Sequence, residues 1–160
     1  MLTASTLNRV KLFDSDNKKN LLRNILFEAI KKFQFLLYAW VILDNHYHIL
    51  FQIKKGKDLS NFIKKIHGQS AIELNNLTTS RGRRVWYQYW DTCIRDDGDY
   101  WRRFNYIHHN PIKHRYTNEM ENYKFSSYQA YLKKYGKDWL DDCFQRYPII
   151  DFTFKKDNNF

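Results

Sequence analysis

The sequence has few cysteines and no long apolar segment. Its two cysteines, Cys93 and Cys143, are too few for the disulfide framework of a small secreted domain and lack the paired spacing of a zinc finger. No apolar run approaches the ~18 residues of a membrane span, and no signal-peptide pattern opens the chain. We therefore expect a soluble protein of a reducing compartment, the cytoplasm, with no membrane partner.

Basic residues outnumber acidic ones. The 27 lysines and arginines against 17 aspartates and glutamates give a formal charge of +10, which is the electrostatic footprint of a nucleic-acid binder. A generic basic protein or one that touches acidic membranes would have the same charge. A hydrophobic content of 43% in 160 residues is enough for one core. We expect one domain over residues 1–150 and a polar tail over residues 151–160.

The segment 45–53, NHYHILFQI, is the centre of the pattern. Its aromatic and β-branched residues predict a strand, along which side chains alternate between two faces. His46 and His48 then share one face, with Cα atoms about 7 Å apart, and the apolar opposite face belongs to the core. Two imidazoles so placed can converge on one metal ion or phosphate. A pair of half-exposed strand residues explains the same pattern without any ligand.

The neighbouring segments predict an α+β domain. Residues 2–7 form a first strand, and an apolar stripe between Leu22 and Phe33 predicts a helix capped within residues 14–16. The apolar run 35–43 pairs with the histidine segment as an antiparallel hairpin. We expect one antiparallel sheet with helices mainly on one face.

Basic residues gather in two segments that could contact DNA. Arginines beside aromatic residues suit single-stranded nucleic acid, because the charge follows the backbone and the rings stack on bases. Lysines on a helix are equally explained as a solvated face, and Trp86 and Trp90 as core residues. The candidates are Lys64 and Lys65 on a helix that begins near residue 58, and Arg81, Arg83 and Arg84 in the loop 78–84.

A third helix is predicted over residues 100–109. Tyr106 and Asn110 are four residues apart and share a face, and Pro111 is expected to end the helix, which puts Asn110 in its last turn. His108 and His109 point about 100° apart and are expected at the surface or behind the site. Arg102, Arg103 and Lys113 on or after this helix are further candidates for DNA contact.

Four of these residues form a coherent chemical set. A divalent ion held by His46, His48 and Asn110 would polarise a scissile phosphate while the Tyr106 hydroxyl attacks phosphorus. A tyrosine hydroxyl has a pKa near ~10, so the ion and nearby cations must activate it.

These residues resemble the tyrosine-dependent His-hydrophobic-His transposases of small bacterial insertion sequences, especially the branch associated with repetitive extragenic palindromes. Three motifs match in order: NHYHIL at 45–50, YIHHNPIK at 106–113 and SSYQAY at 126–131. Asp44 stands where that family usually has proline, which we expect to change only the turn.

The resemblance implies a ferredoxin-like or RRM-like sheet and metal-dependent nicking and joining of single-stranded DNA at hairpins through a 5′-phosphotyrosine intermediate. His46, His48 and Asn110 carry over as ligands of Mg²⁺ or Mn²⁺, and Tyr106 as the nucleophile. The expected partner is single-stranded or hairpin DNA, the expected state a monomer or homodimer, and the expected place the nucleoid.

Two other functions remain open from the residues alone. A protein that only binds single strands or hairpins would need neither Tyr106 nor Asn110. A zinc hydrolase would use the two histidines with water as the nucleophile and would form no covalent adduct.

Overall fold

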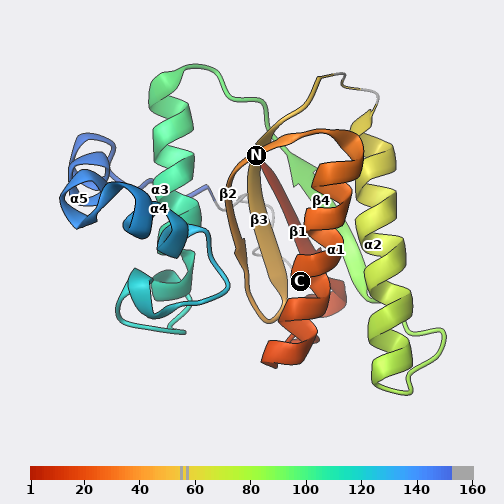
Figure 1. Cartoon of the computed structure of the whole chain (residues 1–160). Helices are drawn as coiled ribbons and strands as arrows, with labels where there is room; N and C mark the ends of the chain where they lie inside the picture. Colours follow the sequence, from red (N-terminus) through yellow and green to blue (C-terminus); the bar gives the residue numbers. More distant parts are fainter. Residues whose placement is uncertain (55, 57, 153–160) are drawn as a thin grey trace.

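The structure is a computed structural model that describes residues 1–54, 56 and 58–152. Most of the predicted tail, residues 153–160, lies outside the described residues. Within them, two short 3₁₀ turns, Leu7–Arg9 and Met120–Asn122, accompany four strands and five α-helices (Figure 1). Their bounds are β1 Leu2–Thr6, α1 Asp16–Phe33, β2 Leu36–Ile42, β3 His46–Gln52, α2 Asp58–Leu77, β4 Trp86–Asp91, α3 Asp97–Lys113, α4 Tyr128–Tyr135 and α5 Lys137–Arg146.

The strands form one antiparallel sheet in the order β2-β3-β1-β4. β2 and β3 make the predicted hairpin, and β3 lies inside the sheet between β2 and β1. The chain order β1-α1-β2-β3-α2-β4 is that of the split βαβ, ferredoxin-like motif. The expected α+β class with an antiparallel sheet is therefore confirmed.

Helices cover both faces of β3. α1 and α2 lie on one side of the sheet and α3 on the other (Figure 1). Phe62 of α2 packs against Phe51, with ring centroids 5.4 Å apart, whereas Tyr106 of α3 packs against His48 at 5.5 Å. Only 4% of His48 is exposed. The helix α3 therefore covers the face of the sheet that carries His48 and shields it from water.

The helix α3 is longer than predicted. It continues through Pro111 to Lys113, and the His114 amide still donates to the Asn110 carbonyl at 3.0 Å. The expectation that Pro111 ends the helix was wrong, because packing against the sheet outweighs the local preference of the residue before proline. Asn110 thus lies one turn before the helix end, and its side chain still faces β3.

The segment before α4 closes one edge of the sheet. The helix α4 begins at Tyr128, and the residues before it run along β2. The Ile42 amide donates to the Phe125 carbonyl at 2.9 Å, and the Ser127 amide to the Trp40 carbonyl at 2.9 Å. These bonds satisfy backbone groups that an open edge strand would expose.

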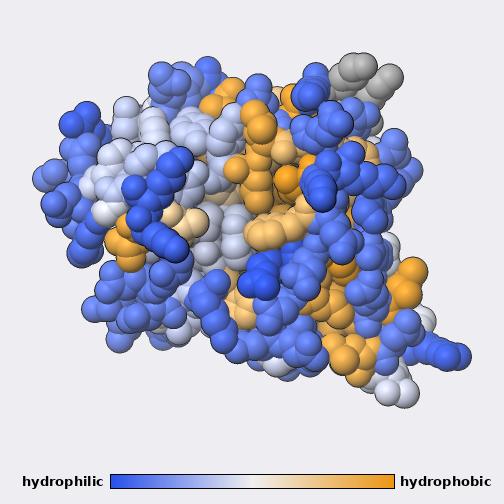
Figure 2. Space-filling view, in the orientation of Figure 1, coloured by the Kyte–Doolittle hydropathy of each residue, from blue (hydrophilic) through white to orange (hydrophobic). Residues whose placement is uncertain are grey.

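The visible surface is divided. Figure 2 shows hydrophobic residues gathered in the middle of the face and at its lower right, with hydrophilic residues over most of the rest. Among the described residues, no helix combines the length and the apolar character that crossing a membrane requires.

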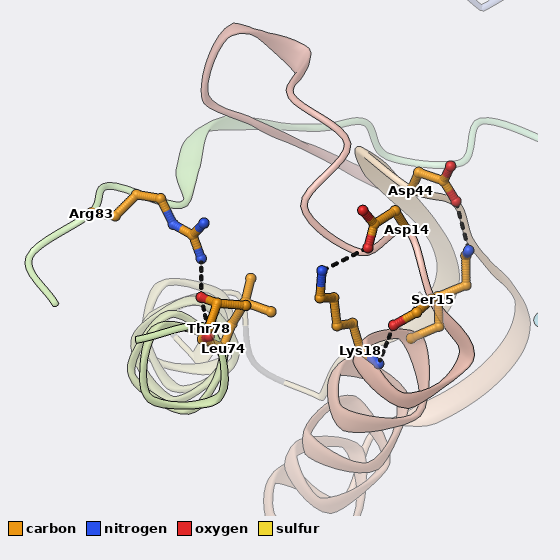
Figure 3. A network of polar contacts seen from close by, with 8 residues as sticks. Asp14, Ser15, Lys18, Asp44, Leu74, Thr78 and Arg83 are labelled. Atoms are coloured by element: carbon orange, nitrogen blue, oxygen red, sulfur yellow. Dashed lines mark hydrogen bonds and ion pairs between the residues drawn. The ribbon is translucent and has the colours of Figure 1, made fainter. Parts of the chain in front are cut away.

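A buried ion pair joins α1 to the turn between β2 and β3. Ser15 caps α1 by accepting from the Lys18 amide, and one residue later in the helix Lys19 donates to Asp44 at 2.6 Å (Figure 3). The two side chains are only 8% and 12% exposed. Asp44 therefore does more than change the turn: it ties the entry to the histidine strand to the first helix.

We expect Lys19→Met to lower the free energy of unfolding by about 3 kcal/mol, because it leaves the Asp44 carboxylate buried without its partner. Lys18→Met is the matched control: Lys18 pairs with Asp14, whose side chain is 52% exposed, and losing such a pair costs ~0.5 kcal/mol. Urea unfolding at pH 7 measures both. Equal effects of the two substitutions would contradict the importance of the Lys19–Asp44 pair.

Candidate active site

The two histidines of β3 meet beneath α3. Their rings lie with centroids 5.1 Å apart at an interplanar angle of 82°. His46 Nδ1 lies 2.7 Å from Asn45 Oδ1, and His48 Nδ1 lies 2.7 Å from the Thr3 hydroxyl on the neighbouring strand β1. The same nitrogen of each ring is thus engaged by a partner, which leaves each Nε2 for the space under α3.

The two atoms that face each other between His46 and Asn110 have no hydrogen to share. Asn45 donates its Nδ2 to the Arg9 carbonyl, so its Oδ1 must accept from His46 Nδ1–H. Asn110 likewise donates its Nδ2 to the Tyr106 carbonyl, which turns its Oδ1 toward His46 Nε2 at 3.3 Å. In a neutral imidazole that Nε2 is an acceptor. Two acceptors then face each other, and a cation between them would satisfy both.

Burial keeps both imidazoles neutral. Desolvation, followed by the charge of His114, lowers the pKa of His46 to about 4. Desolvation, followed by the charges of His46 and His114, lowers the pKa of His48 well below its usual value. At neutral pH both rings therefore keep the lone pairs that a metal ligand needs.

The residues fit a divalent ion with one oxygen ligand. Across the described parts of the chain, no group of three or more His, Cys, Asp or Glu side chains is placed to hold a metal. The third protein ligand would have to be an amide, and Asn110 supplies it. Two imidazole nitrogens and an amide oxygen suit Mn²⁺ or Zn²⁺ as well as Mg²⁺.

Tyr106 lies beside this group on α3. Its ring packs edge-on to His48, and only 5% of the residue is exposed. The Lys113 ammonium donates to the Tyr106 hydroxyl at 3.4 Å and also pairs with Asp151 at 2.8 Å. Burial alone would lower the pKa of Lys113, but its hydrogen bonds to Asp151 and Tyr106 raise it. A positive charge is therefore held at the oxygen that would attack phosphorus.

Asp151 and Phe152, the first two residues of the predicted tail, contact the helix α3. Phe152 lies edge-on to Tyr106 with ring centroids 5.3 Å apart, and the Arg103 guanidinium lies 4.3 Å from the Phe152 ring centroid. The two described residues of the predicted tail thus contact α3 beside the candidate nucleophile.

The arginines of the loop 78–84 lie apart from the histidines. Arg83 donates to Asn75 and to Thr78 (Figure 3), and Arg84 donates to two carbonyls of β4. These hydrogen bonds hold the loop in place, although Arg84, like Arg81, is exposed. DNA contact by this loop stays a prediction.

The other basic candidates are divided between two surfaces. Lys64 and Lys65 lie on α2, across the sheet from the histidines, and Lys65 donates to Gln69. Arg103 is buried in an ion pair with Asp99 at 2.7 Å. Of these cations, the structure brings only Lys113 to Tyr106. The DNA roles of Lys64, Lys65, Arg102 and Arg103 stay predictions.

The structure brings further residues to the histidine pair and places His108 elsewhere than predicted. His114, one helical turn after Asn110, lies with its ring 4.7 Å from that of His46. Thr3 reaches His48 from β1, and its other register partner is Trp90, so Trp90 shares the histidine face. His108, expected at the surface or behind the site, is fully buried and bonds to Ser127 Oγ at 2.7 Å. It belongs to the packing of α3.

Comparison with known proteins shows what the whole chain is similar to. The family model described as "Transposase IS200 like" matches residues 2–110. The chain is 28% identical over 138 residues to a REP-associated tyrosine transposase of Escherichia coli (strain K12), covering 83% of this chain and 76% of that protein. A solved REP-associated tyrosine transposase bound to a REP hairpin has the same fold, with a TM-score of 0.70 and 24% identity over 83% of this chain and 78% of that chain.

We expect His48 to be neutral at pH 6, because burial lowers its pKa. We expect its proton on Nδ1, because the Thr3 hydroxyl, 2.7 Å away, can accept that proton while Nε2 keeps the lone pair that a metal ligand needs. Long-range ¹H–¹⁵N spectra of the protein distinguish the two tautomers. Thr3→Val should mix the tautomers, and Thr3→Ser, which keeps the hydroxyl, should not. A protonated ring at pH 6, or a proton on Nε2, would contradict this assignment.

Proposed function

The chain belongs to the IS200-like transposase family, and from this premise we propose that it nicks and rejoins single-stranded DNA at hairpin sites through a covalent bond between Tyr106 and a 5′-phosphate. A similar chain of known structure is a REP-associated transposase bound to a REP hairpin, which supports hairpins as the substrate class.

One observation carries the proposal. The Tyr106 ring packs on His48, while Asn110, one turn later on the same helix, faces His46. The proposed nucleophile and the three proposed ligand side chains thus come together from two elements far apart in the sequence. A protein that only binds DNA gains nothing from this convergence, which favours the enzyme over the binder.

The chain's own residues account for the steps of the reaction. The Tyr106 oxygen forms a bond to phosphorus as the bond from phosphorus to the 3′-oxygen of the upstream strand breaks. The Lys113 ammonium, which already donates to the Tyr106 hydroxyl, would stabilise the oxygen as its proton leaves. Tyr106 releases its proton to solvent, the departing 3′-oxygen takes up a proton from solvent, and the downstream strand stays attached through its 5′-phosphate. Rejoining is the reverse attack by a 3′-hydroxyl.

Mg²⁺ or Mn²⁺ would be held by His46, His48 and Asn110. When bound, the ion supplies positive charge to the scissile phosphate and its leaving oxygen. Asn45 and Thr3 orient the two imidazoles, which is the usual role of residues behind metal ligands.

Tyr106→Phe is expected to abolish both nicking and the covalent adduct on a labelled stem-loop with Mn²⁺. The ring still packs, so stability should change by no more than about 1 kcal/mol, the worth of one hydrogen bond, and DNA binding should survive. Denaturing gels and mass spectrometry locate the adduct. Tyr87→Phe, at an exposed tyrosine of β4, is the matched control and should behave like the unaltered protein.

The alternatives give different outcomes in the same assay. Nicking by the Tyr106→Phe variant without an adduct would identify water as the nucleophile and favour a metal hydrolase. Absence of nicking by both forms on stem-loops that they bind would favour a protein that only binds DNA.

We further expect His46→Ala to abolish nicking and to weaken Mn²⁺ binding in calorimetric titrations, because it removes one of three protein ligands. Chelation should have the same effect on the unaltered protein. His109→Ala, at a partly exposed histidine of α3, is the control. Normal nicking by His46→Ala would make the histidine pair structural.

A further inference from the structure

A hollow lies at the end of the sheet away from the turn that precedes His46. It has a volume of about 750 Å³, enough for a nucleotide, and is lined by the end of β3, the segment 91–94 and the first turn of α3. In Figure 1 the connection from β4 to α3 crosses this end of the sheet, while the turn that precedes β3 lies at the opposite end. The hollow is continuous with the histidine face, because Leu50 follows His48 by one alternation along β3 and lines it.

Aromatic rings form one side of the hollow. Tyr38 of β2 and Tyr100 of α3 meet with ring centroids 5.6 Å apart, and Trp101 lies 5.0 Å from Tyr100. The Tyr38 hydroxyl donates to Gln52 Oε1 at 2.6 Å, which fixes the position of its ring. Exposed faces of such rings stack on bases regardless of sequence.

Two carboxylates also line the hollow. Asp91 and Asp97 line the hollow and are both exposed, in a chain whose net charge is +10. Carboxylates repel a phosphate but accept hydrogen bonds from the amino groups of bases. The hollow therefore suits the base of a nucleotide and not its backbone.

The helix α3 connects the two sites. Tyr100 precedes Tyr106 by six residues, a rise of about 9 Å along the helix. We propose that the hollow binds one unpaired base of the DNA strand whose phosphate lies at Tyr106, and that it prefers a base with an exocyclic amino group. This assignment rests on the proposed function and adds a determinant of where the strand is cut.

Selection from a pool of stem-loops with randomised single-stranded extensions tests the preference. One extension position should favour guanine, adenine or cytosine over thymine. Asp91→Ala combined with Asp97→Ala removes both acceptors and should abolish that preference without unfolding the protein, because both side chains are exposed. Asp138→Ala is the matched control, since Asp138, like Asp97, lies in the first turn of a helix. A preference that the double variant retains would overturn the proposal.

The native cysteines provide a second measurement. Cys93 lines the hollow and is exposed, whereas Cys143, the chain's other cysteine, is buried. A saturating selected stem-loop should slow alkylation of Cys93 by N-ethylmaleimide about tenfold, the equivalent of one stacked base. Removing the base at the preferred position should restore the rate, and removing any other base should not.

The outcomes separate this inference from the proposed function. No protection of Cys93, or protection that no single abasic position relieves, would overturn the base site while leaving Tyr106 chemistry intact. Failure of the protein to bind any stem-loop would overturn the proposed function and this inference together. If no covalent adduct forms but Cys93 is protected at one specific base position, the reaction at Tyr106 is rejected and the base site is retained.

Discussion

The double burial of β3 is the constraint on which the candidate site depends. Tyr47 and Ile49 lie under α1 and α2, and His48 lies under α3. A slip of one residue in the strand pairing would exchange these faces. It would bury an imidazole against α2 and take Tyr47 out of the core, and the free-energy cost of both changes fixes the register. The same packing removes water from the histidines and keeps them neutral.

Much of this arrangement follows from local patterns in the sequence. The alternation in residues 45–53 predicts the strand and the shared face of His46 and His48, and Ser15 predicts the start of α1. The four-residue spacing of Tyr106 and Asn110 places both on one face of α3. Each of these features depends on neighbours within one turn or one strand, where periodicity carries the information.

Contacts between distant elements could not be predicted in the same way. Thr3 reaches His48 only because β1 pairs with β3 in one register, and Lys19 meets Asp44 across 25 positions. His114 lies one turn after Asn110, close to His46. Its position was not predicted, because the rule that proline ends a helix placed the end of α3 before it. In the folded chain the packing of α3 on the sheet outweighs that rule, and tertiary energy is not visible in a local window.

The segment after α3 packs against that helix and supports it by hydrogen bonds. Asn105 donates to the carbonyls of Cys143 and Tyr147 at the end of α5, and His108 bonds to Ser127. These bonds hold the back of the helix whose front carries Tyr106 and Asn110. The portion that matches the family model stops at residue 110. A version of the chain trimmed there would retain His46, His48, Tyr106 and Asn110, but it would lose Lys113 and the contacts that hold the back of α3. The segment that follows residue 110 is therefore part of what holds the candidate site in its geometry.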